Sequence, residues 1–334
     1  MIKKARIIIL ILTFIFWTGF FGSFFIKKEI KISQQNKKEN NLIKKENKET
    51  PLVKKNKKPE EKIKKNYDIF LPKRIRNDYN VNLNEKSAIA IFFDEKGNTK
   101  ILYQKDIDKK LPIASLTKLM TAMVVIDNYD LDKTTTVSQR AIDTLEEVGR
   151  LHVGEKITIR GLLELSLLVS SNDAATALAE VMGEENFIKK MNEKAKEIGL
   201  KNTYFADPHG LSEKSVSSAR DFAILTEYSI LHYPEIWEIL GAKQKIIKGY
   251  DASGQEIVHI ANNTNTLLSE DYVLGGKTGY TEEAGDTMML AMKAPGSCEG
   301  NVVLVLLGLG IAERIPRTKN LYDWVVWAWD WGIR

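Results

Sequence analysis

Residues 112–121 read Pro112-Ile113-Ala114-Ser115-Leu116-Thr117-Lys118-Leu119-Met120-Thr121. Apolar residues recur at helical spacing from Ser115 to Asn128, so the sequence predicts a helix that Ser115 opens. Lys118 lies one turn further along the same face, where its amine can reach the Ser115 hydroxyl. A serine hydroxyl becomes a nucleophile when a neighbouring base takes its proton. A lysine can be that base only where burial and nearby positive charge lower its pKa.

Two further strings support this interpretation, which the first string alone does not establish because a serine at a helix start is more often an N-cap. Ser170-Ser171-Asn172 lies where one expected helix ends and the next begins. Lys277-Thr278-Gly279 follows an expected strand from Tyr272 to Gly276, and Lys277 supplies a second positive charge if that strand lies alongside Ser115. In this order the three strings predict a serine acyl-transfer site that uses lysine as its base.

The rest of the chain alternates between strand and helix patterns. Strands are expected over Ala88 to Phe93, Thr99 to Tyr103, Lys243 to Gly249, Glu256 to Ile260, Thr287 to Lys293 and Val302 to Leu307. Helices are expected over Leu162 to Val169, Asp173 to Met182, Asn186 to Ile198, Ser218 to Leu231 and from about Ala312 to Trp331. This order predicts an α+β fold, an antiparallel sheet flanked by helices, with the first and last helices on one face.

Composition excludes several classes of protein. The single cysteine, Cys298, excludes an intrachain disulfide, and the four histidines show no zinc-binding spacing. The formal net charge is +5, but the first 66 residues carry +12 and the remainder carries −7. The basic balance therefore belongs to the N-terminal segment and does not indicate a nucleic-acid partner.

An apolar segment lies close to the N-terminus. Residues 7–26 contain no charge and are rich in Ile, Phe and Leu, and a helix of that length spans about 30 Å, the thickness of a hydrocarbon core. Basic residues flank the segment on both sides, which weakens the charge argument for its orientation. We expect an N-terminal membrane anchor over residues 1–26 with the rest of the chain on the extracytoplasmic side. A cleaved signal peptide, which would release a secreted protein, is the alternative.

Residues 27–66 are rich in Lys, Asn and Glu and contain no aromatic residue. Such a segment buries too little apolar surface to offset the entropy lost on ordering, so it predicts a disordered tether. A polybasic strip that lies on anionic lipid or acidic wall polymer is a second interpretation, compatible with the first. The folded domain is expected over residues 67–334.

The chain resembles the penicillin-binding D-alanyl-D-alanine carboxypeptidases of serine peptidase family S11 over roughly residues 85–331. The resemblance rests on Ala114 to Thr121, Ser170 to Ala175, Gly199-Leu200-Lys201-Asn202-Thr203, His209-Gly210-Leu211, Ser217-Ser218-Ala219-Arg220-Asp221 and Gly276-Lys277-Thr278-Gly279-Tyr280-Thr281. It implies a β-lactamase/DD-peptidase-like fold with a helical subdomain. It also implies removal of the terminal D-alanine from peptidoglycan stem peptides that end in D-Ala-D-Ala.

The resemblance implies the catalytic roles. Ser115 attacks the carbonyl of the penultimate D-alanine, and Lys118 accepts the proton of the hydroxyl. Ser170 relays a proton to the leaving D-alanine, and Asn172 orients the substrate amide. Water then hydrolyses the acyl-enzyme, whereas a β-lactam inhibits by leaving a slow ester on Ser115. No metal and no organic cofactor are implied.

The resemblance also implies the substrate-binding groups. Lys277 and Thr278 bind the terminal carboxylate, and Gly279 lets the substrate approach the strand edge. The backbone N–H groups of Ser115 and Tyr280 form the oxyanion hole.

The chain departs from its relatives at several positions. Some relatives carry an arginine where this chain has Thr264, which leaves Arg314 as a candidate for the substrate carboxylate or as a surface residue at a helix start. His209 and Asp221 are expected to shape loops by hydrogen bonding and not to take part in the chemistry. Relatives often add a β-rich C-terminal domain and a membrane helix, whereas this catalytic domain is expected to close near Trp331.

Three classes of function are compatible with these residues. The favoured one is a DD-carboxypeptidase. A sibling enzyme of the same fold, a DD-endopeptidase or a β-lactamase, is the second, although no motif supplies the fast deacylating base that a β-lactamase needs. A non-catalytic protein that binds cell wall is the third, and the presence of every catalytic side chain argues against it.

Overall fold

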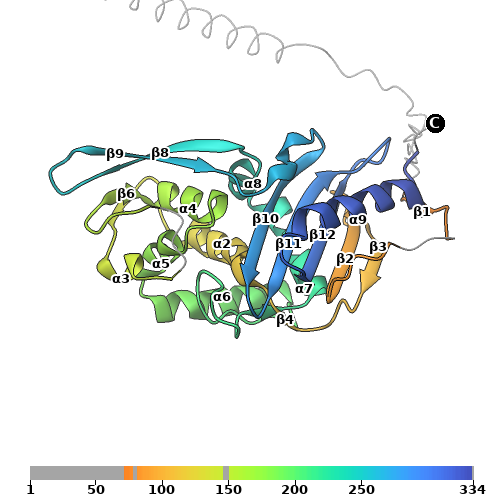
Figure 1. The fold of residues 1–334 in the computed structure, drawn as a ribbon, viewed down its shortest axis with the longest axis horizontal. Coiled ribbons are helices and arrows are strands. Elements are labelled where there is room, and N and C mark those ends of the chain that lie inside the picture. Colours follow the sequence, from red (N-terminus) through yellow and green to blue (C-terminus); the bar gives the residue numbers. More distant parts are fainter. Residues whose placement is uncertain (1–70, 78–80, 146–149, 333–334) are drawn as a thin grey trace, which may run out of the picture. The chain divides into compact units, whose positions relative to one another are not determined.

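The computed structural model of the protein describes residues 71–77, 81–145 and 150–332, and Figure 1 shows how their helices and strands are arranged. These residues belong to one unit of the chain, Asp68–Arg334. The expected membrane segment, residues 7–26, and the expected tether, residues 27–66, lie outside the described residues. Within the described ranges, no helix is both long and apolar enough to cross a membrane.

A five-stranded antiparallel sheet forms the centre of the domain, in the order β10-β11-β12-β2-β3. Its strands are β2 (Ser87–Phe93), β3 (Thr99–Lys105), β10 (Val273–Thr281), β11 (Gly285–Lys293) and β12 (Asn301–Leu309). The expected hairpin is confirmed, because β2 and β3 pair antiparallel. Strand β2 also pairs with β12, so the two ends of the domain meet within this sheet.

Helices cover both faces of the central sheet. Helix α7 (Ala219–His232) packs on one face and α9 (Arg314–Ala328) on the other, and α2 (Lys118–Asn128) belongs to the same core as α7. All seven residues of β2 are buried, and alternate side chains belong to opposite cores. Ile89 and Ile91 share a core with α2 and α7, whereas Ala88 and Phe92 share one with α9. The expectation that the first and last helices share one face is therefore wrong, because strands that are apolar on both sides need a cover on each.

Most of the chain between β3 and β10, apart from α7, forms the expected helical subdomain, which carries a second sheet of its own. Its main helices are α3 (Gln139–Ile142), α4 (Ile159–Leu168), α5 (Asn172–Glu180), α6 (Glu184–Ile198) and α8 (Pro234–Leu240). The sheet has the order β5-β6-β8-β9, with β5 (Thr134–Thr136), β6 (Lys156–Thr158), β8 (Gln244–Tyr250) and β9 (Glu256–Asn262). The expected strands at 243–249 and 256–260 are confirmed as β8 and β9. Strands β5 and β6 were not expected, since three residues are too few for a periodic pattern.

Two element ends differ from expectation. Strand β10 continues through Lys277-Thr278-Gly279 to Thr281, so this string lies inside a strand and not after one. The last helix ends at Ala328, and Trp329–Asp330 form β13, which pairs with β1 (Lys73–Arg74). The remaining short elements are β4 (Leu111–Pro112), η1 (Ala114–Thr117), β7 (Val216–Ser217) and η2 (Thr266–Ser269).

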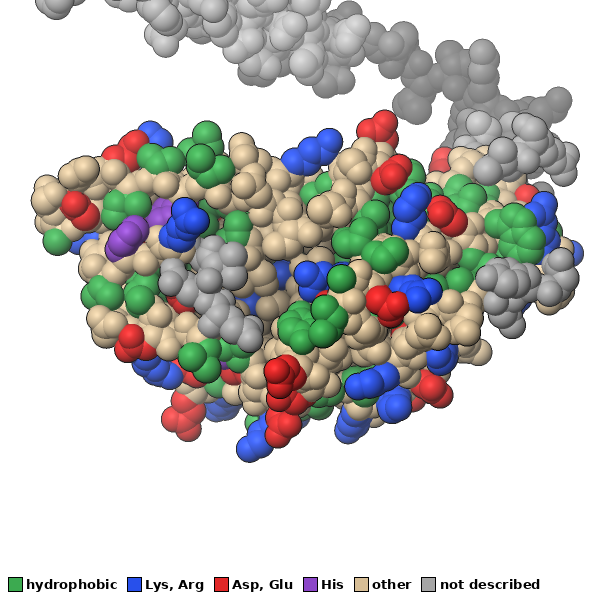
Figure 2. All heavy atoms as spheres, in the orientation of Figure 1, with side chains coloured by type: hydrophobic (Ala, Val, Ile, Leu, Met, Phe, Trp, Pro, Cys, Tyr) green, Lys and Arg blue, Asp and Glu red, His purple; other side chains and the backbone are tan. Residues whose placement is uncertain are grey.

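The surface of the domain shows no field of a single sign on the face in view. Figure 2 shows acidic and basic side chains interspersed over that face.

Candidate active site

The nucleophile candidate lies in a tight turn that leads directly into α2. Ser115 belongs to η1, and Lys118 is the first residue of α2. The Lys118 amine lies 2.8 Å from the Ser115 hydroxyl oxygen, and the Lys118 side chain is completely buried. The expected contact between these two groups is therefore present. The α-helix begins slightly later than the sequence predicts, because Ser115 lies in a 3-10 turn that precedes it.

The surroundings of Lys118 determine what its amine can do. It donates to Asn172 Oδ1 at 2.7 Å and to the His209 carbonyl at 2.9 Å. Asn172 Nδ2 donates to the carbonyl of Leu145 at 2.9 Å, which fixes the amide orientation because a carbonyl can only accept. A neutral amine has two N–H groups and one lone pair. When the N–H groups bond to these two oxygens, the lone pair faces the Ser115 hydroxyl, which is the geometry of a general base.

Ser170 and Lys277 form the second pair of the site. Lys277 donates from Nζ to Ser170 Oγ at 2.8 Å and to the carbonyl of Thr278 at 2.9 Å. Ser170 has a positive φ of 65°, a strained conformation for a serine that holds its side chain between α4 and α5. Burial, followed by the charges of Lys118 and Arg314, lowers the pKa of Lys277 well below its ordinary value. Each positive charge near Lys277 therefore disfavours its protonated form.

Strand β10 lies against the turn that carries Ser115. A Cβ atom added to Gly279 would lie only 2.9 Å from the backbone nitrogen of Ser115 and 2.6 Å from Thr287 Oγ1. The absence of a side chain at Gly279 is what allows this approach. Thr278 Oγ1 lies 2.8 Å from Thr264 Oγ1, and Tyr280, two residues after Thr278, is 38% exposed.

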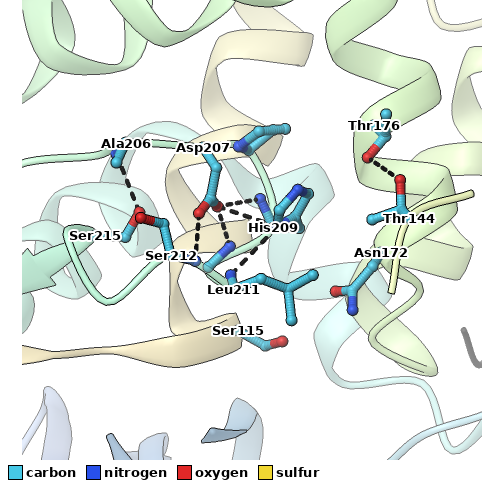
Figure 3. A network of polar contacts seen from close by, with 12 residues as sticks. Ser115, Thr144, Asn172, Thr176, Ala206, Asp207, His209, Leu211, Ser212 and Ser215 are labelled. Atoms are coloured by element: carbon cyan, nitrogen blue, oxygen red, sulfur yellow. Dashed lines mark hydrogen bonds and ion pairs between the residues drawn. The ribbon is translucent and has the colours of Figure 1, made fainter. Parts of the chain in front are cut away.

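A loop that precedes β7 delivers the His209 carbonyl to Lys118, and Figure 3 shows its polar contacts. Its organiser is Asp207, whose carboxylate accepts from the backbone N–H groups of His209, Gly210 and Ser212. Sequence reasoning missed Asp207. The signal was available, because an aspartate before Pro-x-Gly commonly accepts from the backbone of its own turn.

His209 is neutral at physiological pH. Burial and the charge of Lys118 lower its pKa to about 4, although Asp207 acts in the opposite direction. Its Nδ1 accepts from the Leu211 N–H at 3.2 Å, so the 3.2 Å contact between Nδ1 and Asp207 is not a salt bridge. The expectation that His209 shapes the loop is confirmed. Asp221 has the same kind of role, because its carboxylate accepts from the Asn202 N–H.

Arg314 is close to the site, but its guanidinium is held by an ion pair with Asp286. Its Nη1 donates to the carbonyl of Gly279 at 3.2 Å and to Asp286 Oδ1 at 3.1 Å. Asp286, which the sequence did not single out, is 2% exposed and also accepts from the backbone N–H groups of Glu313 and Arg314. No group of three or more His, Cys, Asp or Glu side chains in the described ranges could hold a metal ion.

The site contains two serine hydroxyls, each hydrogen-bonded to a buried lysine amine, beside a strand edge lined by glycine. This arrangement is that of a serine acyl-transfer site that uses lysine as its base.

Comparison with known proteins identifies the family. The chain belongs to peptidase family S11, because the family model described as D-alanyl-D-alanine carboxypeptidase matches residues 76–308. The chain is 34% identical over 244 residues to the D-alanyl-D-alanine carboxypeptidase DacF of Bacillus subtilis, covering 70% of this chain and 59% of that protein. It is 34% identical over 232 residues to a D-alanyl-D-alanine endopeptidase of Pseudomonas aeruginosa, covering 67% of this chain and 73% of the other.

The fold is also shared with solved structures. Penicillin-binding protein D2 of Listeria monocytogenes in its cefotaxime-bound form superposes with a TM-score of 0.63 at 27% identity, covering 74% of this chain and 99% of that one. The expected β-lactamase/DD-peptidase-like α+β fold is thereby confirmed.

Proposed function

We propose that this protein is a serine-type D-Ala-D-Ala carboxypeptidase that removes the terminal D-alanine from peptidoglycan stem peptides through an acyl-enzyme. The observation that carries the proposal is the 2.8 Å contact between the Lys118 amine and the Ser115 hydroxyl, with strand β10 against the Ser115 backbone. The family description and the names of the relatives support it.

Acylation follows from the positions of these groups. The Ser115 oxygen attacks the carbonyl carbon of the penultimate D-alanine while its proton passes to the Lys118 amine. The backbone N–H groups of Ser115 and Tyr280 stabilise the oxyanion, and Lys277 and Thr278 bind the terminal carboxylate. The tetrahedral intermediate then collapses with cleavage of the C–N bond.

The leaving nitrogen needs a proton, and Ser170 lies where it can supply one. Its hydroxyl accepts from Lys277 at 2.8 Å, so a proton given up by Ser170 can be replaced from that lysine. The proton on Lys118 then returns through solvent to Lys277, which had supplied one to Ser170, so the Lys118 amine is neutral again. In the second step water attacks the ester while its proton passes to Lys118, and Lys118 gives that proton to the departing Ser115 oxygen, which restores the hydroxyl. A β-lactam enters the same path but leaves an ester that hydrolyses slowly, a role that the cefotaxime-bound relative supports.

Release of D-alanine tests this function directly. Purified protein is incubated with a tripeptide that ends in D-Ala-D-Ala and, separately, with crosslinked peptide dimers. Free D-alanine from the tripeptide, and none with Ser115→Ala, is the expected result. The absence of D-alanine from any such peptide contradicts the proposal.

A DD-endopeptidase that cleaves crosslinks is the second candidate. It is favoured by the Pseudomonas aeruginosa relative, which bears that name at the same 34% identity and is covered to a larger share of its length. Cleavage of the dimers faster than the tripeptide would select this alternative.

For the N-terminal segment we propose anchoring in the cell membrane through residues 7–26, with residues 27–66 as a tether and the catalytic domain on the extracytoplasmic side. The support is the uncharged apolar run and the basic, aromatic-free segment after it.

A further inference from the structure

We propose that Arg314 is a positioning residue for the oxyanion hole: it holds the peptide unit between Gly279 and Tyr280 so that the Tyr280 N–H faces the reacting carbonyl. This inference rests on the proposed function, and it reassigns a residue that the sequence offered as a ligand for the substrate carboxylate.

The contacts of the guanidinium carry the argument. Its Nη1 lies 3.2 Å from the Gly279 carbonyl oxygen and 3.1 Å from Asp286 Oδ1. The Asp286 side chain is 3% exposed and the Arg314 side chain 33% exposed, so this ion pair is anchored at its buried end. Asp286 Oδ2 also accepts from the backbone N–H groups of Glu313 and Arg314. One carboxylate therefore fixes both the start of α9 and the direction of the arginine.

The geometry of a peptide bond transmits this position to the site. The C=O and N–H groups of a trans peptide point in opposite directions, and the described residues contain no cis peptide. The carbonyl of Gly279 points to Arg314, so the N–H of Tyr280, which belongs to the same peptide unit, points the other way. Gly279 itself lies against the backbone nitrogen of Ser115, which is the other oxyanion donor.

A charged donor on that carbonyl has two physical effects. It fixes the tilt of the peptide plane, and hydrogen bonds to a charged group are about twice as strong as neutral ones. It also polarises the amide, so the N–H at the far end becomes a better donor to a developing negative charge. Both effects matter most when the substrate oxygen is an oxyanion, that is, in the transition state.

A role in binding the substrate carboxylate makes a different prediction. A carboxylate ligand holds substrate and transition state alike, so its removal raises KM and affects only ligands that carry the carboxylate. A positioning residue for the oxyanion hole lowers kcat and affects every ligand with a tetrahedral oxyanion. Boronic acids separate the two, because they form a tetrahedral adduct with the serine and can be made with or without a carboxylate.

The experiment compares wild type, Arg314→Gln, Arg314→Lys and Arg317→Gln. Arg317 is the matched control, since it lies one turn further along α9 and pairs with Glu313 at 2.7 Å. For Arg314→Gln we expect kcat for D-alanine release to fall about tenfold to a hundredfold, less than the loss from deleting an oxyanion donor itself. We expect KM to change little, and the inhibition constants of both boronic acids, with and without a carboxylate, to rise together. Arg317→Gln is expected to match wild type.

The Lys variant keeps the test decisive if the Gln variant does not fold. A lysine amine can serve the Gly279 carbonyl or Asp286 but not both with the same geometry, so kcat is expected to lie between wild type and Arg314→Gln. A rise in KM alone, or weaker inhibition only by the carboxylate-bearing boronic acid, overturns the inference for either variant. An unchanged kcat in Arg314→Gln overturns it too. A wild-type protein that releases no D-alanine and forms no adduct with penicillin would instead refute the proposed function.

Discussion

At the scale of single residues, Lys118 and Lys277 show how burial changes the chemistry of lysine, which is usually a charged surface residue. Both side chains are at most 1% exposed, and each amine lies 2.8 Å from a serine hydroxyl oxygen. The sequence predicted the contact between Ser115 and Lys118, because the spacing of three residues fixes it. The partners Asn172 and the His209 carbonyl come from 54 and 91 residues away, and only the fold brings them together.

Lys277 is expected to lower the stability of the fold, because its function requires a buried amine. Replacement by Met, which removes an amine whose charged form burial and the neighbouring Arg314 disfavour, is expected to abolish acylation but to raise stability at neutral pH by roughly 1 kcal/mol. The folded state has the lower pKa, so the cost is complete below that pKa. It disappears as pH rises toward the ordinary lysine value of about 10.4. Thermal unfolding of both proteins from pH 7 to pH 10 should therefore show the difference shrinking.

Lys245→Met is the matched control for that measurement. Lys245 lies 2.6 Å from Glu164, a carboxylate whose side chain is 11% exposed. Removing this lysine leaves a nearly buried charge without its ion-pair partner, so the variant is expected to lose about 1–3 kcal/mol. A Lys277→Met protein that is less stable than wild type at pH 7 would contradict the argument.

At the scale of elements, the loop from Asp207 to Ser212 must touch the nucleophile turn. Gly210 has a φ of 89°, and a Cβ atom there would lie 1.9 Å from the carbonyl oxygen of Ala114. Gly210→Ala therefore forces either the loop or the turn that carries Ser115 to move. We expect a loss of at least about 3 kcal/mol of stability, together with slow penicillin acylation.

Gly199→Ala separates backbone strain from this contact. Gly199 caps α6 with a φ of 86°, but nothing lies within 4 Å of an added Cβ atom. The expected cost is about 1 kcal/mol from the left-handed conformation alone, with acylation at the rate of wild type. Equal effects of the two substitutions, measured by thermal unfolding and by labelling with fluorescent penicillin, would contradict this account of the loop.

The same scale shows where sequence patterns succeed and fail. Helix α6 ends at Gly199 as predicted, because a left-handed cap has a residue signature. Strand β10 extends beyond its expected end, because glycines and polar residues mask a strand whose pairing with β11 is continuous from Gly275 to Thr281. The predicted last helix runs too far, to Trp331, because the apolar tryptophans near the C-terminus also fit a helical pattern. Trp329 instead belongs to the short strand β13, which pairs with β1.

At the scale of the whole molecule, helices cover both faces of the central sheet. The acyl-transfer residues, from Ser115 to Lys277, are spread over more than 160 residues of the sequence, and the fold brings them together. The class of fold was predictable from the order of strands and helices. The distribution of helices over the two faces was not, because a strand that is apolar on every residue does not tell which neighbour covers which side.

The catalytic unit and the N-terminal segment are expected to be separable. The chain divides between Tyr67 and Asp68. Removal of residues 1–66 is expected to leave the rate of penicillin acylation within about twofold and to abolish cosedimentation with lipid vesicles, since the apolar run and the basic tether leave together. A shortened protein that still sediments with vesicles, or a full-length one that does not, would contradict the proposed anchor.

The central claim is that the Lys118 amine activates the Ser115 hydroxyl. The most direct measurement is the intact mass of the protein over time after addition of a penicillin, for wild type, Ser115→Ala and Lys118→Met. We expect one antibiotic mass on the Ser115 peptide of wild type, none on Ser115→Ala, and acylation about 10²–10⁴-fold slower for Lys118→Met. An adduct that forms equally fast without the hydroxyl, or without the amine, would contradict the account.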